Sequence, residues 1–231
     1  MLKALSLTKK YGGHTALNAL DLTIGKGEIF CLLGQNGAGK TTTINLFLGF
    51  TSPTSGAAFI NGMEVKSNNS ATRKFIAYIP EVVMLYGNLS GVENLEFFSR
   101  LAGFRYSADL LSGFLLAAGL QKEIHGKRVA TYSKGMRQKV GIAIALAKNA
   151  EAILMDEPTS GLDPKATAEF TEICKTLAME GRTIFMATHD IFNAVNVASQ
   201  IGIMKEGSLV HTVDPADITA VQLQSLYLQT I

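Results

Sequence analysis

Short apolar segments dominate the first third of the chain, and their length favours β-strands over helices. Partly alternating apolar residues predict strands from Leu2 to Thr8 and from Ala16 to Ile24, with a glycine-containing turn between them. The run from Ile29 to Leu33 is apolar throughout, which is typical of a strand buried on both faces. The apolar residues from Ile44 to Leu48 predict a helix after this strand.

Two more strands are expected before residue 82, and turn-forming residues bound both of them. The segment from Ala57 to Ile60 follows a Pro-Thr-Ser-Gly turn at residues 53–56 and precedes Asn61-Gly62, a strong turn signal. The segment from Arg73 to Ile79 also has the composition of a strand, and Pro80 ends it.

The spacing of apolar residues changes at about residue 82, and as far as residue 150 it is typical of amphipathic helices. Ser90 and Glu93 are placed as a capping box that opens a helix. Its apolar face carries Leu95, Phe98 and Leu101. A second helix carries Leu111, Phe114, Leu115 and Ala118 on one face and ends at Gly119. These faces are most simply core, and docking of a partner on part of this surface stays open.

Polar residues directly follow two apolar strands in the last third of the chain. Ala152 to Met155 precedes Asp156 and Glu157, and Thr183 to Ala187 precedes Thr188-His189-Asp190. A helix is expected between these strands, opening at Asp163-Pro164 and closing at Gly181. Two closing strands at 201–204 and 208–213 and a terminal helix that starts at 214 complete the prediction.

Composition narrows the class of protein. The chain has 231 residues, enough for a large core, and no apolar run is long enough to cross a bilayer. Its net charge of +2 gives no argument for binding nucleic acid. Lys9 and Lys10 interrupt the early apolar residues, so no secretory signal is expected and we expect the chain to stay in the cytoplasm. Cys31 and Cys174 are expected in the core, in keeping with a reducing compartment.

Residues 34–42 carry the strongest chemical signal in the chain. They fit the pattern G-x-x-x-x-G-K-[ST] and lie between a predicted strand and a predicted helix, which is the context that a phosphate loop requires. Glycines let several backbone N–H groups point inward toward a polyphosphate, and the start of the helix adds its positive end. Lys40 would supply charge to the β- and γ-phosphates, and Thr41 would hold Mg²⁺. The expected nucleotide-binding residues are Gly34, Gln35, Asn36, Gly37, Ala38, Gly39, Lys40, Thr41 and Thr42.

The polar residues that end the later strands complete this chemistry. Parallel strands deliver their carboxyl ends to one edge of a sheet, so Asp156 is expected to hold Mg²⁺ and Glu157 to polarise or deprotonate the attacking water. His189 can reach a γ-phosphate from the same edge and donate a hydrogen bond to the charge that develops there.

Two features stay open on local grounds. Ser133 is placed as the N-cap of a helix with the apolar residues Met136, Val140, Ala143, Ile144 and Ala147, and Gly135 would permit an anion to approach its N-terminus. An ordinary capped helix explains the same pattern. Tyr11 is suited either to stacking on adenine or to packing in the core or at a turn.

The order and spacing of six elements resemble an ATP-binding-cassette ATPase, the nucleotide-binding subunit of an ABC transporter. They are Tyr11 as the adenine-stacking aromatic, Gly34 to Thr42 as Walker A, Tyr-Ser-Lys-Gly-Met at 132–136 as the signature, Ile-Leu-Met-Asp-Glu at 153–157 as Walker B, Ser-Gly-Leu-Asp at 160–163 as the D-loop, and His189 as the switch histidine. The resemblance extends from the start of the chain to about Lys205.

This resemblance implies an α/β fold: a P-loop NTPase core with a RecA-like, mainly parallel sheet, an N-terminal antiparallel β subdomain and an inserted α-helical subdomain. Residues 1–231 would form a single ABC ATPase domain. Its nucleotide-binding core and β subdomain would comprise 1–81 and 151–213, the helical subdomain with the signature 82–150, and a C-terminal helix 214–231.

The resemblance also implies partners. In this family two cassettes pair head to tail, and the phosphate loop of one and the signature of the other enclose each ATP with its Mg²⁺. Ser133 and Gly135 would contact the γ-phosphate bound by the other copy, and Asp163 would lie at the interface. A homodimer or a pair with a paralogous cassette would drive an integral membrane permease from the cytoplasmic face of the membrane, and no nucleic acid is expected.

Two positions depart from the family pattern. Pro80-Glu81 stands where the family usually has Gln, and this variant resembles cassettes of the ABC-2 export type. Glu81 is expected to order a magnesium-bound water while adding negative charge. The signature has Lys134 in place of a glycine, which adds a cation near the phosphates. We therefore expect an ATPase that energises export; the alternatives are an importer subunit and a soluble ATP-switched clamp.

Overall fold

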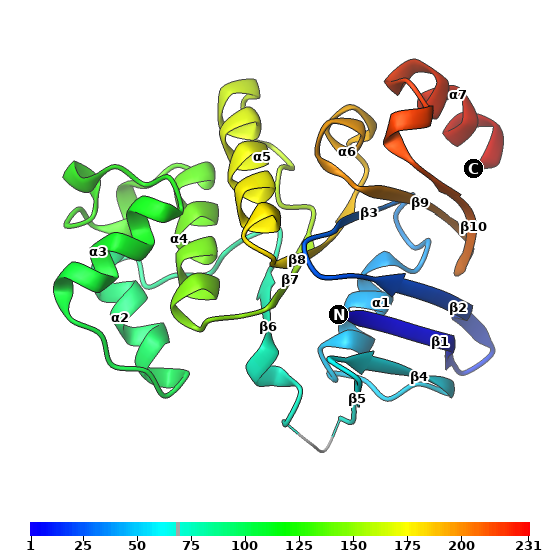
Figure 1. The fold of residues 1–231 in the computed structure, drawn as a ribbon, viewed down its shortest axis with the longest axis horizontal. Coiled ribbons are helices and arrows are strands. Elements are labelled where there is room, and N and C mark those ends of the chain that lie inside the picture. Colours follow the sequence, from blue (N-terminus) through cyan, green and yellow to red (C-terminus); the bar gives the residue numbers. More distant parts are fainter. Residues whose placement is uncertain (68–69) are drawn as a thin grey trace.

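The computed structural model describes residues 1–67 and 70–231 and contains two β-sheets with helices around them (Figure 1). The strands are β1 (Leu2–Tyr11), β2 (His14–Ile24), β3 (Ile29–Gly34), β4 (Ser55–Ile60), β5 (Met63–Glu64), β6 (Ile76–Ile79), β7 (Ala152–Asp156), β8 (Thr183–Thr188), β9 (Gln200–Lys205) and β10 (Ser208–Val213). The helices are α1 (Lys40–Phe47), α2 (Gly91–Leu101), α3 (Ala108–Ala117), α4 (Lys134–Ala147), α5 (Pro164–Met179), α6 (Ile191–Val197) and α7 (Ala220–Thr230).

The two sheets differ in strand direction. The N-terminal sheet has the order β2-β1-β4-β5 and is antiparallel. The central sheet has the order β10-β9-β3-β8-β7-β6; its strands from β9 to β6 are parallel, and β10 is an antiparallel edge strand. The predicted fold class is therefore confirmed: a mainly parallel sheet accompanied by an antiparallel N-terminal sheet.

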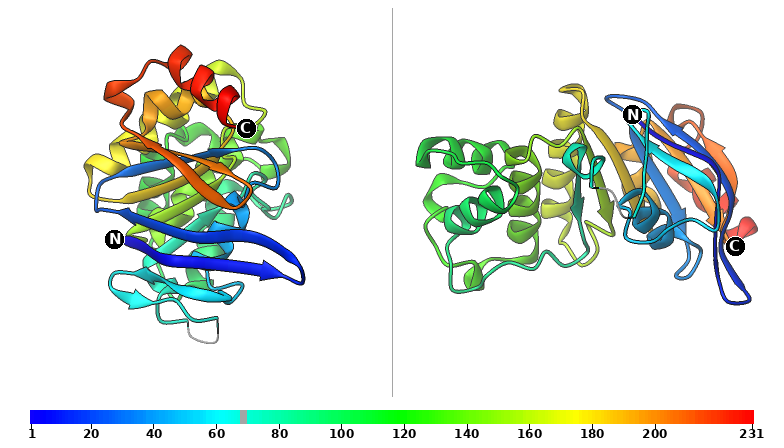
Figure 2. Two further views of the ribbon diagram at one scale, coloured as in Figure 1. Left: turned by 90° about the vertical axis from the view of Figure 1, so that its right-hand side faces the viewer. Right: turned by 90° about the horizontal axis from the view of Figure 1, so that it is seen from below.

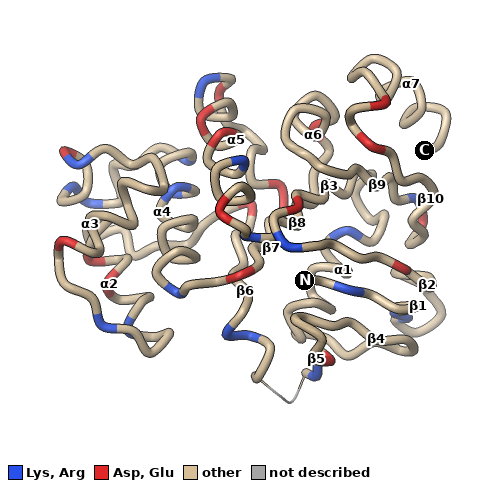
Figure 3. Tube along the Cα trace, viewed as in Figure 1, with Lys and Arg blue, Asp and Glu red and all other residues tan. Residues whose placement is uncertain are grey.

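Helices cover both faces of the central sheet. Helix α1 lies between the two sheets, whereas α5, α6 and α7 lie on the opposite side of the central sheet (Figures 1 and 2). Helices α2, α3 and α4 gather at the end of the molecule farthest from the antiparallel sheet (Figure 1). Lys, Arg, Asp and Glu residues occur throughout the molecule, from helices α2, α3 and α4 to the antiparallel sheet (Figure 3).

Strand β3 is apolar throughout because both of its faces are buried. Phe30 packs in the core shared with α1 and the antiparallel sheet, while Cys31 packs in the core beneath the opposite helices. The rings of Phe30 and Phe185 are stacked with their centroids 5.9 Å apart, and the ring of Phe47 of α1 lies tilted to that of Phe185 at 6.2 Å. Cys31 and Cys174 are both free and buried, as expected, and burial raises the pKa of the Cys31 thiol to about 12.

Three expectations from the sequence are wrong in detail. The predicted strand from Arg73 to Ile79 is a 3₁₀ turn over Arg73–Phe75 followed by the shorter β6. The terminal helix does not start at residue 214: a 3₁₀ turn at Pro215–Asp217 comes first, and α7 begins after Thr219, which forms a capping box with Gln222. On α2, Leu101 is 69% exposed rather than part of the buried face.

Gly56 and Gly62 offer a matched test of how tightly β4 packs on β1. Both have left-handed φ values, +72° and +75°, but an added Cβ at Gly56 would collide with the carbonyl oxygens of Leu5 and Ser6, whereas at Gly62 it would meet open space. Gly62→Ala should cost about 1 kcal/mol of backbone strain. Gly56→Ala should cost roughly 1–3 kcal/mol more, because β1 must move. Thermal unfolding of the two variants measures the difference, and equal losses of Tm would contradict this packing.

Candidate nucleotide-binding site

The site begins where β3 turns into α1. Gly39 occupies the N-cap position of α1 with φ +111°, a conformation that favours glycine. A Cβ on Gly39 would lie 2.6 Å from the carbonyl oxygen of Ala16, so the loop packs against β2 without room for a side chain. The N–H groups of the first turn of α1 therefore face the loop with no capping side chain among them, which is the geometry of a phosphate-binding helix start.

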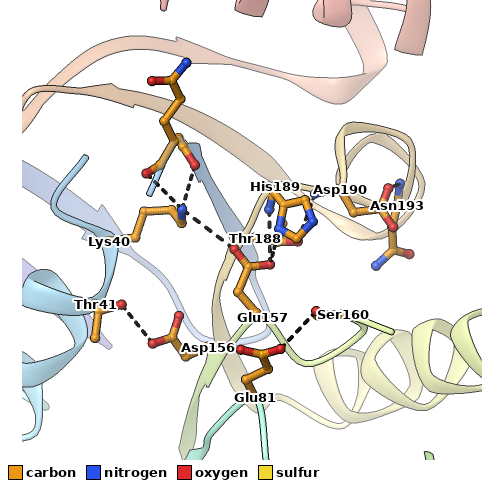
Figure 4. A network of polar contacts seen from close by, with 12 residues as sticks. Lys40, Thr41, Glu81, Asp156, Glu157, Ser160, Thr188, His189, Asp190 and Asn193 are labelled. Atoms are coloured by element: carbon orange, nitrogen blue, oxygen red, sulfur yellow. Dashed lines mark hydrogen bonds and ion pairs between the residues drawn. The ribbon is translucent and has the colours of Figure 1, made fainter. Parts of the chain in front are cut away.

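Lys40 crosses this loop from the first position of α1. Its ammonium group donates to the carbonyl oxygens of Gly34 (2.6 Å) and Gln35 (3.3 Å) and lies 3.7 Å from Glu157 Oε1 (Figure 4). Only 5% of Lys40 is exposed. A buried ammonium needs hydrogen-bond partners and an opposite charge, and these three oxygens provide both.

Thr41 and Asp156 meet on the other side of the same cleft. The Thr41 hydroxyl donates to Asp156 Oδ2 at 2.9 Å. Burial raises the pKa of Asp156 and the nearby charge of Glu157 raises it further, while the hydrogen bond from Thr41 acts in the opposite direction. A hydroxyl and a carboxylate in contact are the hard oxygen donors that Mg²⁺ prefers, so these two residues fit a magnesium site.

Glu157 directly follows β7 with φ +47°. Its carboxylate contacts both Lys40 of the phosphate loop and His189 at the end of β8. Its Oε2 lies 2.8 Å from His189 Nδ1 and accepts from the His189 backbone N–H at 3.3 Å. Its Oε1 is buried and has no hydrogen-bond partner among the described residues, although Lys40 faces it. The buried oxygen is an acceptor available to a water or ligand in the cleft.

Glu81 reaches the cleft from the segment after β6. Its Oε1 accepts from Ser160 Oγ at 3.0 Å and lies 3.4 Å from Lys134 Nζ. The hydrogen bonds from Ser160 and Lys134 lower the pKa of Glu81. The backbone of this segment is tied to α4, because the Gln138 side chain donates to the carbonyl oxygens of Pro80 (3.2 Å) and Glu81 (2.9 Å).

Most of the predicted site residues line one cleft of about 260 Å³. Its lining residues are Gln35, Asn36, Gly37, Gly39, Lys40, Thr41, Thr42, Glu81, Asp156 and Glu157. Gly34 adjoins it through the carbonyl that accepts from Lys40, and Ala38 faces a neighbouring hollow beside β9. His189 is joined to the cleft through Glu157 and lines the adjacent hollow by the D-loop segment.

Besides Gly34, Ala38 and His189, four predicted residues do not line the cleft: Ser133, Gly135, Asp163 and Tyr11. Ser133 caps α4 by accepting from the Met136 N–H at 3.2 Å, and Asp163 caps α5 by accepting from the Ala166 N–H at 2.9 Å. Gly135 is buried against this second helix start: a Cβ on it would lie 3.3 Å from the Ala166 side chain. The start of the signature helix and the D-loop of one chain are thus packed together.

Tyr11, the fourth of these residues, ends β1. Its side chain is 50% exposed, and Lys9 Nζ lies 4.8 Å from the ring centroid. Tyr11 pairs with His14 at the start of β2, the strand whose Ala16 contacts the phosphate loop. The ring is therefore available on the strand pair that supports the loop.

Sequence reasoning missed two residues that hold the site together. Gln138 is 1% exposed on the face of α4 that also carries the buried Gly135 and Ile142. The sequence signal that could have identified Gln138 is a polar residue at helical spacing between apolar positions, which indicates a buried polar side chain with a specific partner. Ser160 was recognised only as part of a motif, and nothing in its sequence position predicts the hydrogen bond to Glu81.

Comparison with known proteins decides the family. The sequence pattern of the ABC transporter family matches residues 17–160, well over half of the chain. The chain belongs to the ABC transporter family. Within that family it is an ATP-binding subunit, whose activity is ATP hydrolysis coupled to transport.

Individual relatives of this ABC subunit support the same family assignment. The bacitracin transport ATP-binding protein BcrA of Enterococcus faecalis is 36% identical over 94% of the chain and 70% of its own length. The lantibiotic transport ATP-binding protein SrtF of Streptococcus pyogenes is 37% identical over 91% of the chain and 89% of its own length. A dimeric post-hydrolysis structure of the ATP-binding cassette MJ0796, bound to ADP and Pi, superposes with a TM-score of 0.81 at 27% identity, covering 93% of this chain and 99% of that one.

The half-buried carboxylate of Asp156 predicts a pH-dependent effect on stability. A carboxylate whose pKa is raised by folding destabilises the fold above its unfolded pKa, and this penalty disappears as the pH falls through the folded pKa. Asp156→Asn should therefore raise the Tm near neutral pH by about 4 °C at most, because solvent screens a half-buried charge, and the gain should vanish toward about pH 4. Thermal unfolding across pH measures this, and a gain that does not depend on pH would contradict it.

Proposed function

We propose that this ABC subunit binds MgATP in the cleft above α1 and hydrolyses it at the interface of a head-to-tail dimer, so as to drive export through a separate membrane permease. The observation that carries the proposal is the convergence of Lys40, Thr41, Asp156 and Glu157 on one cleft at the carboxyl edge of β3 and β7. That edge is where parallel α/β sheets bind nucleotides.

The phosphate loop would hold the triphosphate. Phosphate oxygens offer Lys40 the same kind of acceptor as the carbonyls of Gly34 and Gln35 to which it now donates. The N–H groups at the start of α1 would bind the same phosphates, with Gly37 (φ +84°) leaving space for their approach. Tyr11 would stack on the adenine from the β1–β2 hairpin.

Thr41 and Asp156 would hold Mg²⁺, with Glu81 binding one of its waters. When bound, Mg²⁺ would neutralise negative charge on the phosphates. The supporting observation is the donor set: the hydroxyl and the carboxylate already touch at 2.9 Å, and Glu81 lines the same cleft.

Glu157 is the proposed general base. Its buried Oε1 would accept a proton from the attacking water, and His189 orients the carboxylate through Oε2 at 2.8 Å. His189 is exposed enough to turn toward a γ-phosphate and donate a hydrogen bond to it. Lys40 would remain the fixed positive charge beside both groups.

A second cassette would complete the site, as a homodimer or with a paralogous cassette. Ser133 at the start of α4 is exposed and does not line the cleft of its own chain, so the anion-binding end of this helix is available to another copy. Gly135 and Asp163 lie beside it at the junction of α4 with α5. The dimeric structure of the related cassette MJ0796 supports this arrangement.

The permease would supply the membrane-spanning part, because no helix within residues 1–67 and 70–231 is long and apolar enough to cross a membrane. Exposed apolar side chains gather near α2. Met84 (80% exposed) lines a hollow beside the partly buried Phe98, and the exposed Tyr86 packs edge-on to Phe97 with ring centroids 4.9 Å apart. Such a patch favours a protein partner. Docking there would place the subunit on the cytoplasmic face of the membrane, and the transport proteins for bacitracin and lantibiotics among its relatives favour export.

Glu157→Gln tests the proposed mechanism. The amide cannot take the proton, so steady-state ATP hydrolysis should fall by about 10²-fold or more. Because ATP is bound and not cleaved, size-exclusion chromatography with light scattering should detect a dimer that persists in MgATP. Glu169→Gln is the matched control and should leave hydrolysis unchanged, since Glu169 pairs with Lys139 and neither residue lines the cleft. Normal turnover by Glu157→Gln would assign the base to another residue.

Met84→Asp tests the docking surface. A charge at this exposed position should leave the ATPase rate and the Tm of the isolated chain unchanged but weaken association with the permease roughly tenfold. Co-purification from membranes measures the association. Val221→Asp, at an equally apolar exposed position on α7, is the control and should assemble normally. Assembly of the Met84→Asp variant at full strength would move the docking surface elsewhere.

A further inference from the structure

Glu81 is the residue at which the nucleotide cleft meets the start of α4. Its Oε1 accepts a hydrogen bond from Ser160 at 3.0 Å and pairs with Lys134 at 3.4 Å (Figure 4 shows the Ser160 bond). The same residue lines the cleft that contains Thr41 and Asp156. One carboxylate is therefore within reach of two different positive groups: a lysine of the signature and a cation at the proposed magnesium site.

The side chain of Glu81 can move while its backbone stays in place. Gln138, itself 1% exposed, anchors the carbonyls of Pro80 and Glu81 to α4. The Glu81 side chain, by contrast, is 52% exposed, and that of Lys134 is 31% exposed. Rotation of an exposed side chain is fast, and a partly exposed ion pair is worth little, so a stronger cation can displace Lys134.

The charges in the cleft set the direction of this exchange. Glu81 adds a third carboxylate to Asp156 and Glu157, and Lys40 is already paired with Glu157. Among the described residues, Lys134 is the lysine that pairs with Glu81. A hydrated divalent ion held by Asp156 would attract Glu81 more strongly than the single, partly exposed ammonium of Lys134 does.

We propose that the Glu81 carboxylate interacts either with Lys134 or with a water of the magnesium ion that accompanies a bound nucleotide, but not with both at once. Binding of Mg-nucleotide in one chain then releases Lys134 and Ser160 of the same chain. This inference rests on the proposed head-to-tail dimer: the released Lys134 becomes available to the γ-phosphate bound by the second copy. Loading of one site thereby prepares the other, which makes nucleotide binding by the dimer cooperative.

The exchange can be measured on the monomer. A fluorescent, non-hydrolysable ATP analogue is titrated with Mg²⁺ at a protein concentration at which light scattering reports a monomer. Lys134→Met removes the competitor, so the Mg²⁺ concentration at half-maximal binding should fall roughly twofold to fivefold, the range expected for a partly exposed ion pair. Ser160→Ala should shift it in the same direction, because the hydrogen bond from the Ser160 hydroxyl to the same carboxylate oxygen is lost.

Two controls separate an exchange from a general change of charge. In a Glu81→Gln background Lys134→Met should have no further effect, because the carboxylate that it pairs with is gone. Lys139→Met removes another lysine of α4, one that pairs with Glu169 at 2.6 Å, and should leave the Mg²⁺ midpoint unchanged. An unchanged midpoint for Lys134→Met, or a shift that persists with Glu81→Gln, overturns the proposal.

The dimer provides a separate readout. In the non-hydrolysing Glu157→Gln variant, ATP binding should be cooperative, and adding Lys134→Met should lower the Hill coefficient toward 1. If the Mg²⁺ midpoint of the monomer responds to Lys134→Met but ATP never produces a dimer, the proposed function fails and the exchange stands. If the dimer forms and neither the midpoint nor the Hill coefficient responds, the exchange fails and the proposed function stands.

Discussion

The buried ammonium of Lys40 is the constraint on which the rest of the site depends. A charge that is 5% exposed is tolerated only where oxygens surround it, and the chain provides the carbonyls of Gly34 and Gln35 together with the carboxylate of Glu157. These partners come from two places: the loop that follows β3 and the residue that follows β7. The loop must therefore turn back over the start of α1, and Gly39 permits this at φ +111° because it has no side chain to strike Ala16. The position of Lys40 thus fixes the loop and the acid in relation to each other.

The register of the central sheet brings the phosphate loop, the acids and the histidine together at one site. Strand β8 lies between β3 and β7, with Leu33 beside Thr188 and Asp156 beside Ala187. Since all three strands run in the same direction, their polar continuations emerge at one edge. The Glu157 N–H donates to the Ala187 carbonyl at 2.8 Å, which turns the Glu157 side chain toward His189. A residue shift in either pairing would separate the histidine, the acids and the phosphate loop, so strand pairing and catalytic geometry are the same property of this fold.

Local sequence signals predict the structure well at positions where the backbone geometry favours only a few residue types. The phosphate loop, the acids at the end of β7 and the caps Ser90, Ser133 and Asp163 were all predictable, because tight turns, strand ends and helix starts demand particular residues. Contacts between segments were not predictable. Arg73–Phe75 has strand-like composition but forms a 3₁₀ turn, and Leu101 fits an apolar periodicity yet is exposed. In both cases tertiary packing, which leaves no local trace, overrides propensity.

The two departures from the family pattern illustrate this limit most clearly. A carboxylate at position 81 and an ammonium at position 134 are 53 residues apart, and in the sequence they are two independent oddities. In the folded chain they are 3.4 Å apart, with Ser160 bonded to the same carboxylate oxygen. Each change alone would place an uncompensated charge beside the cleft: a third acid next to Asp156 and Glu157, or a lysine without a carboxylate. Together they cancel, and because both remain partly exposed the pair is weak enough to open. An opposite-charge pair that is near both the phosphate loop and the signature therefore couples two motifs that a neutral amide and a glycine would leave electrostatically independent.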